Sequence, residues 1–149
     1  MPEYLETSVD KFTFKVATDR YYTSEGVWAL EENGGVRVGL SDFVQQRSGD
    51  VAFAEVKPTG ITLAAGEDMA VIETIKVNIT HTSPVNGKIV EVNPAMNSSP
   101  EAINQDPYGA GWLAVLEVNN WDTDRAGLLE PQAYFTSMKG QAEKEARKP

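Results

Sequence analysis

The chain contains no cysteine and only one histidine, His81, among its 149 residues. The lack of cysteine excludes disulfide bridges, thiolate zinc sites, iron–sulfur ligation and a thiol nucleophile. A single histidine without neighbouring ligands offers no metal cluster. We therefore expect no metal site, and we expect any redox chemistry to come from a group attached to the protein.

Basic residues and long apolar runs are also scarce. The chain has 13 Lys plus Arg against 22 Asp plus Glu, which gives a net charge of −9. Such a balance argues against a nucleic-acid-binding surface, because that affinity rests on basic clusters. No apolar run approaches membrane-spanning length, and the first residues are acidic and polar, unlike a signal peptide. We expect a cytoplasmic protein with neither a nucleic acid nor a membrane as partner.

What the chain does contain is a series of short segments in which apolar and polar residues alternate, separated by glycine turns. Residues 12–16, 50–56 and 113–118 have the period of two that is typical of half-buried strands. Asn33-Gly34-Gly35 is a hairpin turn signal between two further β-prone segments. Ser41 and Gly49 bracket a short helix, since serine favours the N-cap and glycine the C-terminal end.

These segments predict a mainly β protein, a flattened barrel or β-sandwich with short helices and a C-terminal helix. The helical spacing at the end of the chain covers residues 132–148. The length suits one domain over residues 1–149, which is large enough to bury a core without staples. We expect its ends, at about residues 1–11 and 140–149, to be loosely ordered tails.

Lys76 lies between two of the strand-like segments, residues 69–72 and 87–92. The residues between these segments form a tight excursion with Lys76 near its tip. A lysine in such a place is either an ordinary solvated charge or an attachment point that other proteins can reach. Glu73 either helps a modifying enzyme recognise the lysine or only solvates the turn, and these residues alone leave both questions open.

The chain resembles the lipoyl-carrier proteins of the glycine cleavage H-protein type from about Tyr21 to Tyr134. The lysine stretch, Glu73-Thr74-Ile75-Lys76 with Ser83-Pro84 and Gly87 downstream, carries one part of the resemblance. A second stretch, Asn104 through Asp106-Pro107-Tyr108-Gly109 to Gly111-Trp112, follows at the spacing of the family. A Glu-x-x-Lys motif alone is unspecific, whereas the two stretches together are specific.

This resemblance implies the hammerhead fold of lipoyl domains and lipoic acid in amide linkage on Lys76. It also implies a carrier that is not itself an enzyme and that depends on lipoate ligase or other lipoylation enzymes. Biotin carriers resemble one another in methionines beside the lysine, whereas Ile75 and Val77 stand here. A phosphopantetheine carrier would need a serine at the start of a helix in a four-helix bundle, which disagrees with the many strands.

The sequence departs from the glycine cleavage pattern around the expected arm. The residue before the first tryptophan is typically Glu in that family but is Val27 here. The usual Ala-Ala-Ser-Asp-like run after the lysine is replaced by Val77-Asn78-Ile79-Thr80. In the family, these groups line a cleft for a cationic aminomethyl group, and an ammonium without carboxylate partners would be poorly solvated there.

The departures favour a divergent relative, similar to the lipoate-binding proteins of bacterial sulfur oxidation. Its arm would then work with a heterodisulfide-reductase-like complex and dihydrolipoamide dehydrogenase. The alternative is an H protein that carries the aminomethyl group between glycine decarboxylase and aminomethyltransferase. A third possibility is an unmodified scaffold relative in which Lys76 is an ordinary surface lysine.

The predicted surroundings of the arm are Glu73, Val27, Ile79, Thr80 and His81. For His81 we expect an exposed turn residue rather than a catalytic base, because no partner base or metal ligand accompanies it. We expect the three tryptophans to pack in the core and at sheet edges rather than to form a binding platform. We predict no catalytic residue.

Overall fold

The computed structural model describes residues 3–147. Within this part of the chain the strands are β1 Tyr4–Val9, β2 Phe12–Ala17, β3 Tyr21–Tyr22, β4 Val27–Glu32, β5 Gly35–Leu40, β6 Val51–Val56, β7 Thr62–Leu63, β8 Asp68–Thr74, β9 Asn78–Thr82, β10 Gly87–Val92 and β11 Ala114–Glu117. The helices are α1 Asp42–Ser48, α2 Ala95–Ser98, α3 Ala102–Gln105, α4 Trp121–Ala126 and α5 Pro131–Ala146.

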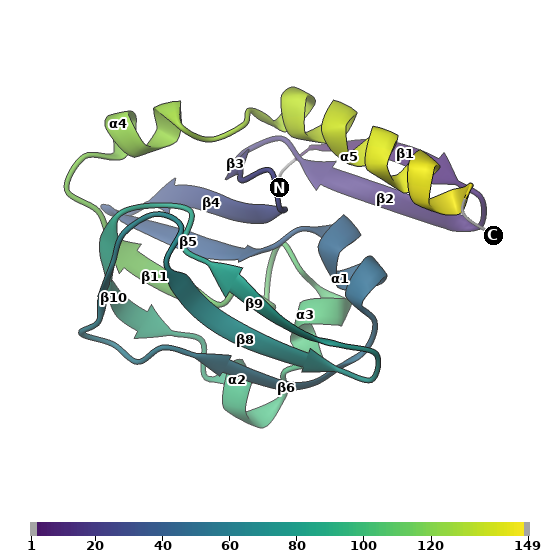
Figure 1. Ribbon diagram of the computed structural model, residues 1–149. Coiled ribbons are helices and arrows are strands. Elements are labelled where there is room, and N and C mark those ends of the chain that lie inside the picture. Colours follow the sequence, from purple (N-terminus) through teal and green to yellow (C-terminus); the bar gives the residue numbers. More distant parts are fainter. Residues whose placement is uncertain (1–2, 148–149) are drawn as a thin grey trace.

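Two antiparallel sheets form the body of the molecule (Figure 1). The larger has the strand order β3-β4-β5-β11-β10-β7, and the smaller has the order β6-β8-β9. One apolar cluster joins them, with Val38 and Leu116 from the larger sheet and Ile72 from the smaller one fully or almost fully buried. The prediction of a mainly β protein with short helices and a C-terminal helix is confirmed. The sheets pack as separate layers and do not close into a barrel.

A third layer consists of the β1–β2 hairpin and α5, which lie together at one side of the sheets (Figure 1). A second apolar cluster holds this layer in place and includes Phe14, Trp28, Phe43, Tyr134 and Met138. Burial of these aromatic side chains supplies a large apolar area in a small volume. The prediction that Trp28 packs in the core is confirmed, because its side chain is fully buried.

The two tails expected to be loosely ordered are largely regular structure. Residues 4–9 form β1 and pair with β2 over the whole strand, and α5 continues to Ala146. The expectation is therefore wrong for residues 4–9 and 140–146. The physical reason is that each tail covers the other, since α5 contacts both strands of the hairpin. Residues 1–2 and 148–149 of these predicted tails lie outside the described residues.

The turn and cap signals take the predicted conformations. Asn33 and Gly34 have positive φ angles of 52° and 80° in the β4–β5 hairpin, as a tight hairpin turn requires. The hydroxyl of Ser41 accepts a hydrogen bond from the N–H of Val44 at the start of α1, and Gly49 ends that helix with φ of 91°. These local signals fix the path of the chain into β6.

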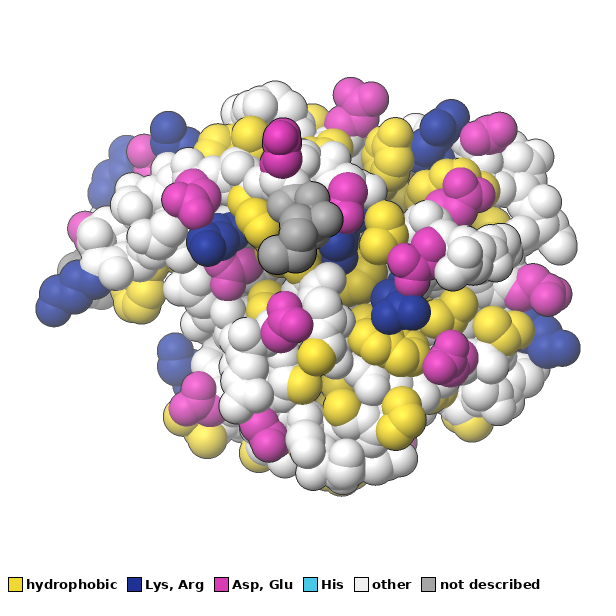
Figure 2. Space-filling view, turned by 180° about the vertical axis from the view of Figure 1, so that it is seen from behind, with side chains coloured by type: hydrophobic (Ala, Val, Ile, Leu, Met, Phe, Trp, Pro, Cys, Tyr) yellow, Lys and Arg dark blue, Asp and Glu magenta, His cyan; other side chains and the backbone are white. Residues whose placement is uncertain are grey.

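The surface shows no large single-sign patch on the face seen in Figure 2, where acidic side chains are spread among hydrophobic and uncharged ones. Among residues 3–147, no helix combines the length and the apolar character needed to cross a bilayer.

Candidate functional site

Lys76 lies at the tip of the β8–β9 hairpin, which is the location that the sequence predicts. The partner strand differs from the prediction. Residues 78–82 form β9 and pair with β8, whereas β10 belongs to the other sheet. The sequence pattern did not predict β9, because its inward residues are Ile79 and His81 and the polar histidine interrupts the apolar alternation.

The side chain of Thr74 shapes the turn that carries the lysine. Its hydroxyl oxygen accepts hydrogen bonds from the N–H groups of Lys76 and Val77 at 3.1 and 3.0 Å. The same hydroxyl donates to the carbonyl of Ser48 at 2.8 Å, and the N–H of Ile75 donates to the carbonyl of Asp50 at 3.1 Å. These hydrogen bonds hold the tip of the hairpin in a fixed turn and attach it to Ser48, the last residue of α1, and to Asp50. An exposed lysine is presented on a firmly held turn.

The hydrocarbon part of Lys76 lies over Gly49. A Cβ atom placed on Gly49 would come within 3.3 Å of Lys76 Cδ and 3.4 Å of Cε. Asn104 holds this glycine from the other side, because its amide donates to the carbonyl of Gly49 at 3.1 Å and its oxygen accepts from Val51 N–H at 2.8 Å. The second stretch of the sequence resemblance therefore supports the surface against which the lysine lies.

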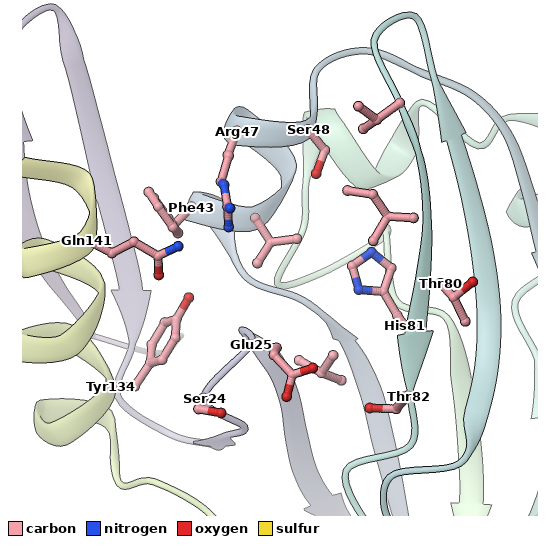
Figure 3. A pocket seen from close by; sticks show the side chains of 14 residues that line it. Ser24, Glu25, Phe43, Arg47, Ser48, Thr80, His81, Thr82, Tyr134 and Gln141 are labelled. Carbon is pink, nitrogen blue, oxygen red and sulfur yellow. The ribbon is translucent and has the colours of Figure 1, made fainter. Parts of the chain in front are cut away.

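A cleft of about 560 Å³ opens beside the hairpin (Figure 3). It lies between α1, β9, α5 and the loop before β4, and four of the predicted surrounding residues line it: Val27, Ile79, Thr80 and His81. Glu73 does not line the cleft, since it is paired in the sheet with Phe53 and Asn78. Lys76 is also absent from this lining and belongs to a neighbouring groove described below.

His81 is buried, so the prediction of an exposed turn residue is wrong. It lies in β9 opposite Ala70, its side chain is 7 % exposed, and its ring faces the cleft (Figure 3). Burial lowers the pKa of His81 from 6.5 to about 4, because the charged form loses its hydration in the interior. The imidazole is therefore neutral at pH 7.

Several cleft residues were not found from the sequence. Glu25 is exposed at the rim, and Arg47 enters from α1 (Figure 3). Arg47 Nε lies 3.3 Å from Glu145 Oε2, so that the guanidinium is paired with a carboxylate of α5. Glutamate and arginine are common in any solvated loop or helix, so their residue types gave no signal. Only tertiary packing brings Glu25 and Arg47 to the same cleft.

Tyr134 closes the α5 side of the cleft. Its hydroxyl is 2.7 Å from the hydroxyl of Ser41, and both side chains are buried. Burial raises the pKa of Tyr134 to about 12, so it is a neutral hydrogen-bonding group at physiological pH. Among residues 3–147, no group of three or more His, Asp or Glu side chains has an arrangement that could hold a metal ion.

An exposed lysine on a firmly held turn beside an open cleft is an arrangement that suits the presentation of an attached group to other proteins. The family model described as "Glycine cleavage H-protein" matches residues 20–141. The chain belongs to this family. Its members are non-catalytic carriers that hold lipoic acid on a lysine.

Relatives of known name agree with this assignment. A "Glycine cleavage system H protein" of Thermus thermophilus is 39% identical over 127 residues, which cover 85% of this chain and 98% of the relative. One of Stenotrophomonas maltophilia is 39% identical over 125 residues, covering 83% and 95%. A crystal structure of the Mycobacterium marinum glycine cleavage system H protein superposes with a TM-score of 0.74 at 32% identity, covering 81% and 97%.

The residues around Lys76 fit a lipoyl group. The turn is exposed, and the lysine hydrocarbon already follows the protein surface toward apolar neighbours. An amide-linked arm is uncharged, so it can lie against such a surface without the cost of desolvating an ammonium.

Proposed function

We propose that Lys76 carries the lipoyl group and that the protein moves intermediates between partner enzymes on this arm. The observation that supports the proposal is the presentation of Lys76 on the tip of the β8–β9 hairpin, tied down by Thr74 and by the Ile75–Asp50 hydrogen bond. A group that several active sites must reach needs an exposed position on a rigid support.

The attached group would supply the dithiol–disulfide chemistry. The protein's own residues would present the arm and exclude water from part of it. Amide formation removes the charge of the lysine, and the cleft beside the hairpin offers Val27, Val44 and Ile79 as apolar wall. The carrier itself needs no acid or base for this task.

Glycine cleavage is the first candidate pathway, and the names of the relatives support it. The arm would then carry an aminomethyl group between glycine decarboxylase and aminomethyltransferase, and dihydrolipoamide dehydrogenase would reoxidise it. Glu25 supports this candidate from the structure, since it brings a carboxylate to the cleft although Val27 stands where the family has Glu. A carboxylate can pair with the cationic amine of that cargo.

Sulfur oxidation, with a heterodisulfide-reductase-like complex as partner, is the second candidate. The lining of the cleft favours it, because Val27 and Ile79 are apolar, His81 is neutral, and Glu25 lies at the exposed rim. A neutral sulfur cargo needs no buried carboxylate, and Arg47, which lines the cleft, is already paired with Glu145.

Intact-mass analysis after co-production with a lipoylation system tests the attachment. We expect one lipoyl group on the wild type and none on Lys76→Arg, whereas Lys88→Arg, at an exposed lysine in β10, keeps the modification. No mass gain would leave the unmodified scaffold as the better description. A gain that survives Lys76→Arg would place the attachment elsewhere.

Exchange of bicarbonate into glycine by glycine decarboxylase separates the two pathways. If the protein serves glycine cleavage, the lipoylated wild type supports exchange and Glu25→Gln weakens it. If exchange is absent while the arm is turned over by a heterodisulfide-reductase-like complex, the sulfur pathway is correct. Glu31→Gln, at an exposed carboxylate of β4 that does not line the cleft, serves as the control for loss of a negative surface charge.

A further inference from the structure

The β1–β2 hairpin and the last turn of α5 lie outside the residues that the family model matches, 20–141. They are nevertheless firmly attached to α1. The N–H of Lys15 donates to Asp42 Oδ2 at 2.9 Å, and Gln46 Nε2 donates to the carbonyl of Thr13 at 2.9 Å. Phe14 and Phe43 pack edge to face with ring centroids 5.2 Å apart. This layer is a fixed part of the surface near the lysine.

Between this layer and α1 lies a groove of about 270 Å³, which we call the hairpin groove. Its apolar lining residues are Val9, Phe12, Phe14, Phe43, Ala142 and Ala146, and its polar or charged lining residues are Asp10, Gln46, Arg47, Lys76 and Glu145. Phe12 is 57 % exposed although it is aromatic, and it stacks on Phe14 with a centroid distance of 6.2 Å. Exposed apolar surface of this kind is a mark of a binding site when it lines a concave feature.

Lys76 is the residue that connects the hairpin groove to the function. Its side chain lines this groove, whereas it does not line the larger cleft. Its hydrocarbon lies over Gly49, the residue that follows α1. Arg47 and Glu145 of the lining are paired with each other, and an amide-linked hydrocarbon can pack against the apolar part of the wall without the desolvation cost of an ammonium.

We propose that the hairpin groove is the resting site of the lipoyl arm, a neutral hydrocarbon chain that ends in a small disulfide ring or, when reduced, in two neutral thiols. The proposal rests on the proposed lipoylation of Lys76. The occupant is the chain's own arm, because Lys76 forms part of the wall and six of the residues that line the groove are apolar. The docked arm leaves the hairpin groove when a partner enzyme binds. The larger cleft beside the β8–β9 hairpin stays free for an arm that carries a cargo.

Methyl chemical shifts of the lipoylated protein, compared with the unmodified protein, test the resting site. We expect shifts at Val9, Ala142 and Ala146, which line the hairpin groove. Shifts confined to Val27, Val44 and Ile79 would show that the arm rests in the cleft and would overturn the proposal. Shifts that grow with protein concentration would show that a second copy occupies the groove, and they would also overturn it.

Alkylation of the reduced arm gives a second readout, and the lack of cysteine makes it clean because the arm carries the only thiols. If about nine-tenths of the arms are docked, iodoacetamide reacts about tenfold more slowly than with a free arm. Phe12→Ser should restore the fast rate. Tyr4→Ser, at an exposed aromatic of the same hairpin that does not line the groove, should not.

The mass of each sample distinguishes the two proposals. A sample without a lipoyl group on Lys76 contradicts the proposed function. A lipoylated sample with a fast alkylation rate in the wild type, and equal rates in Phe12→Ser and Tyr4→Ser, contradicts the resting site alone. Urea unfolding of both variants shows whether the hairpin is still folded, and methyl shifts of the wild type remain decisive if it is not.

Discussion

Acidification is expected to destabilise this protein through His81, which is buried at the wall of the cleft. The pKa of its side chain is about 4 in the folded chain and 6.5 in the unfolded reference. Between these two values the unfolded chain binds a proton that the folded chain does not. The free energy of unfolding therefore rises with pH in this window. The stability that depends on a neutral His81 is fully present above about pH 6.5 and is lost as the pH falls toward about 4.

The size of the effect follows from the shift in pKa. Each pKa unit corresponds to about 1.4 kcal/mol, so a shift from 6.5 to about 4 allows a total of about 3 kcal/mol. At about pH 5 the loss is about 2 kcal/mol, because the unfolded imidazole is almost fully protonated and the folded one is still largely neutral. For a domain with a free energy of unfolding of about 5–15 kcal/mol, this is a large fraction.

Urea unfolding of the wild type and His81→Gln at several pH values between about 8 and about 5 measures the effect. Tryptophan fluorescence, to which the fully buried Trp28 contributes, reports the transition. Glutamine does not titrate, and the carboxylates titrate in both proteins, so the pH dependence of the difference belongs to His81. A difference between the two proteins that stays constant over this range would refute the burial argument.

Two glycines should respond in opposite directions to alanine when the free energy of unfolding is measured in urea. Gly49→Ala should cost about 1–3 kcal/mol, because φ of 91° with ψ of −172° is open only to glycine. Gly140→Ala in the middle of α5 should stabilise by about 0.5–1 kcal/mol, because glycine loses more backbone entropy in a helix and an added Cβ there would lie in open space. Tyr134→Phe should cost about 1 kcal/mol for its hydrogen bond to Ser41. Ser41→Ala should cost about 2–3 kcal/mol in the same measurement, because it removes the N-cap of α1 and also leaves the Tyr134 hydroxyl unpaired. Equal losses for Ser41→Ala and Tyr134→Phe would contradict this assignment.

Local signals explain why much of the fold was predictable. The turn at Asn33 and Gly34, the N-cap at Ser41 and the helix end at Gly49 each depend on residues within a few positions of one another. Glycine at positive φ and serine at an N-cap have little competition from the rest of the chain. The location of Lys76 on a hairpin tip belongs to the same kind of inference.

Two strands were missed because their apolar face is supplied from far away in the sequence. In β1 the half-buried residues are Leu5, Thr7 and Val9, and a threonine in the middle weakens the alternation. Their cover is α5, from the other end of the chain. In β9 the inward histidine has the same effect. Tertiary contacts decide such segments, so a pattern of period two cannot reveal them.

The burial of Val27 gives a different interpretation of its departure from the family pattern. From the sequence, Val27 stood for a missing carboxylate, but its side chain is only 1 % exposed and serves as packing between the sheet and α1. The carboxylate nearest in the sequence, Glu25, lines the same cleft from a loop. The exposed carboxylate of Glu25 does not replace a buried one, because water screens an exposed ion pair and the pair contributes little to the binding of a cation. The cargo therefore depends on whether Glu25 can hold a cation at the rim. An aminomethyl cargo predicts that Glu25→Gln lowers glycine exchange severalfold, and a sulfur cargo predicts that the same substitution leaves turnover of the arm unchanged.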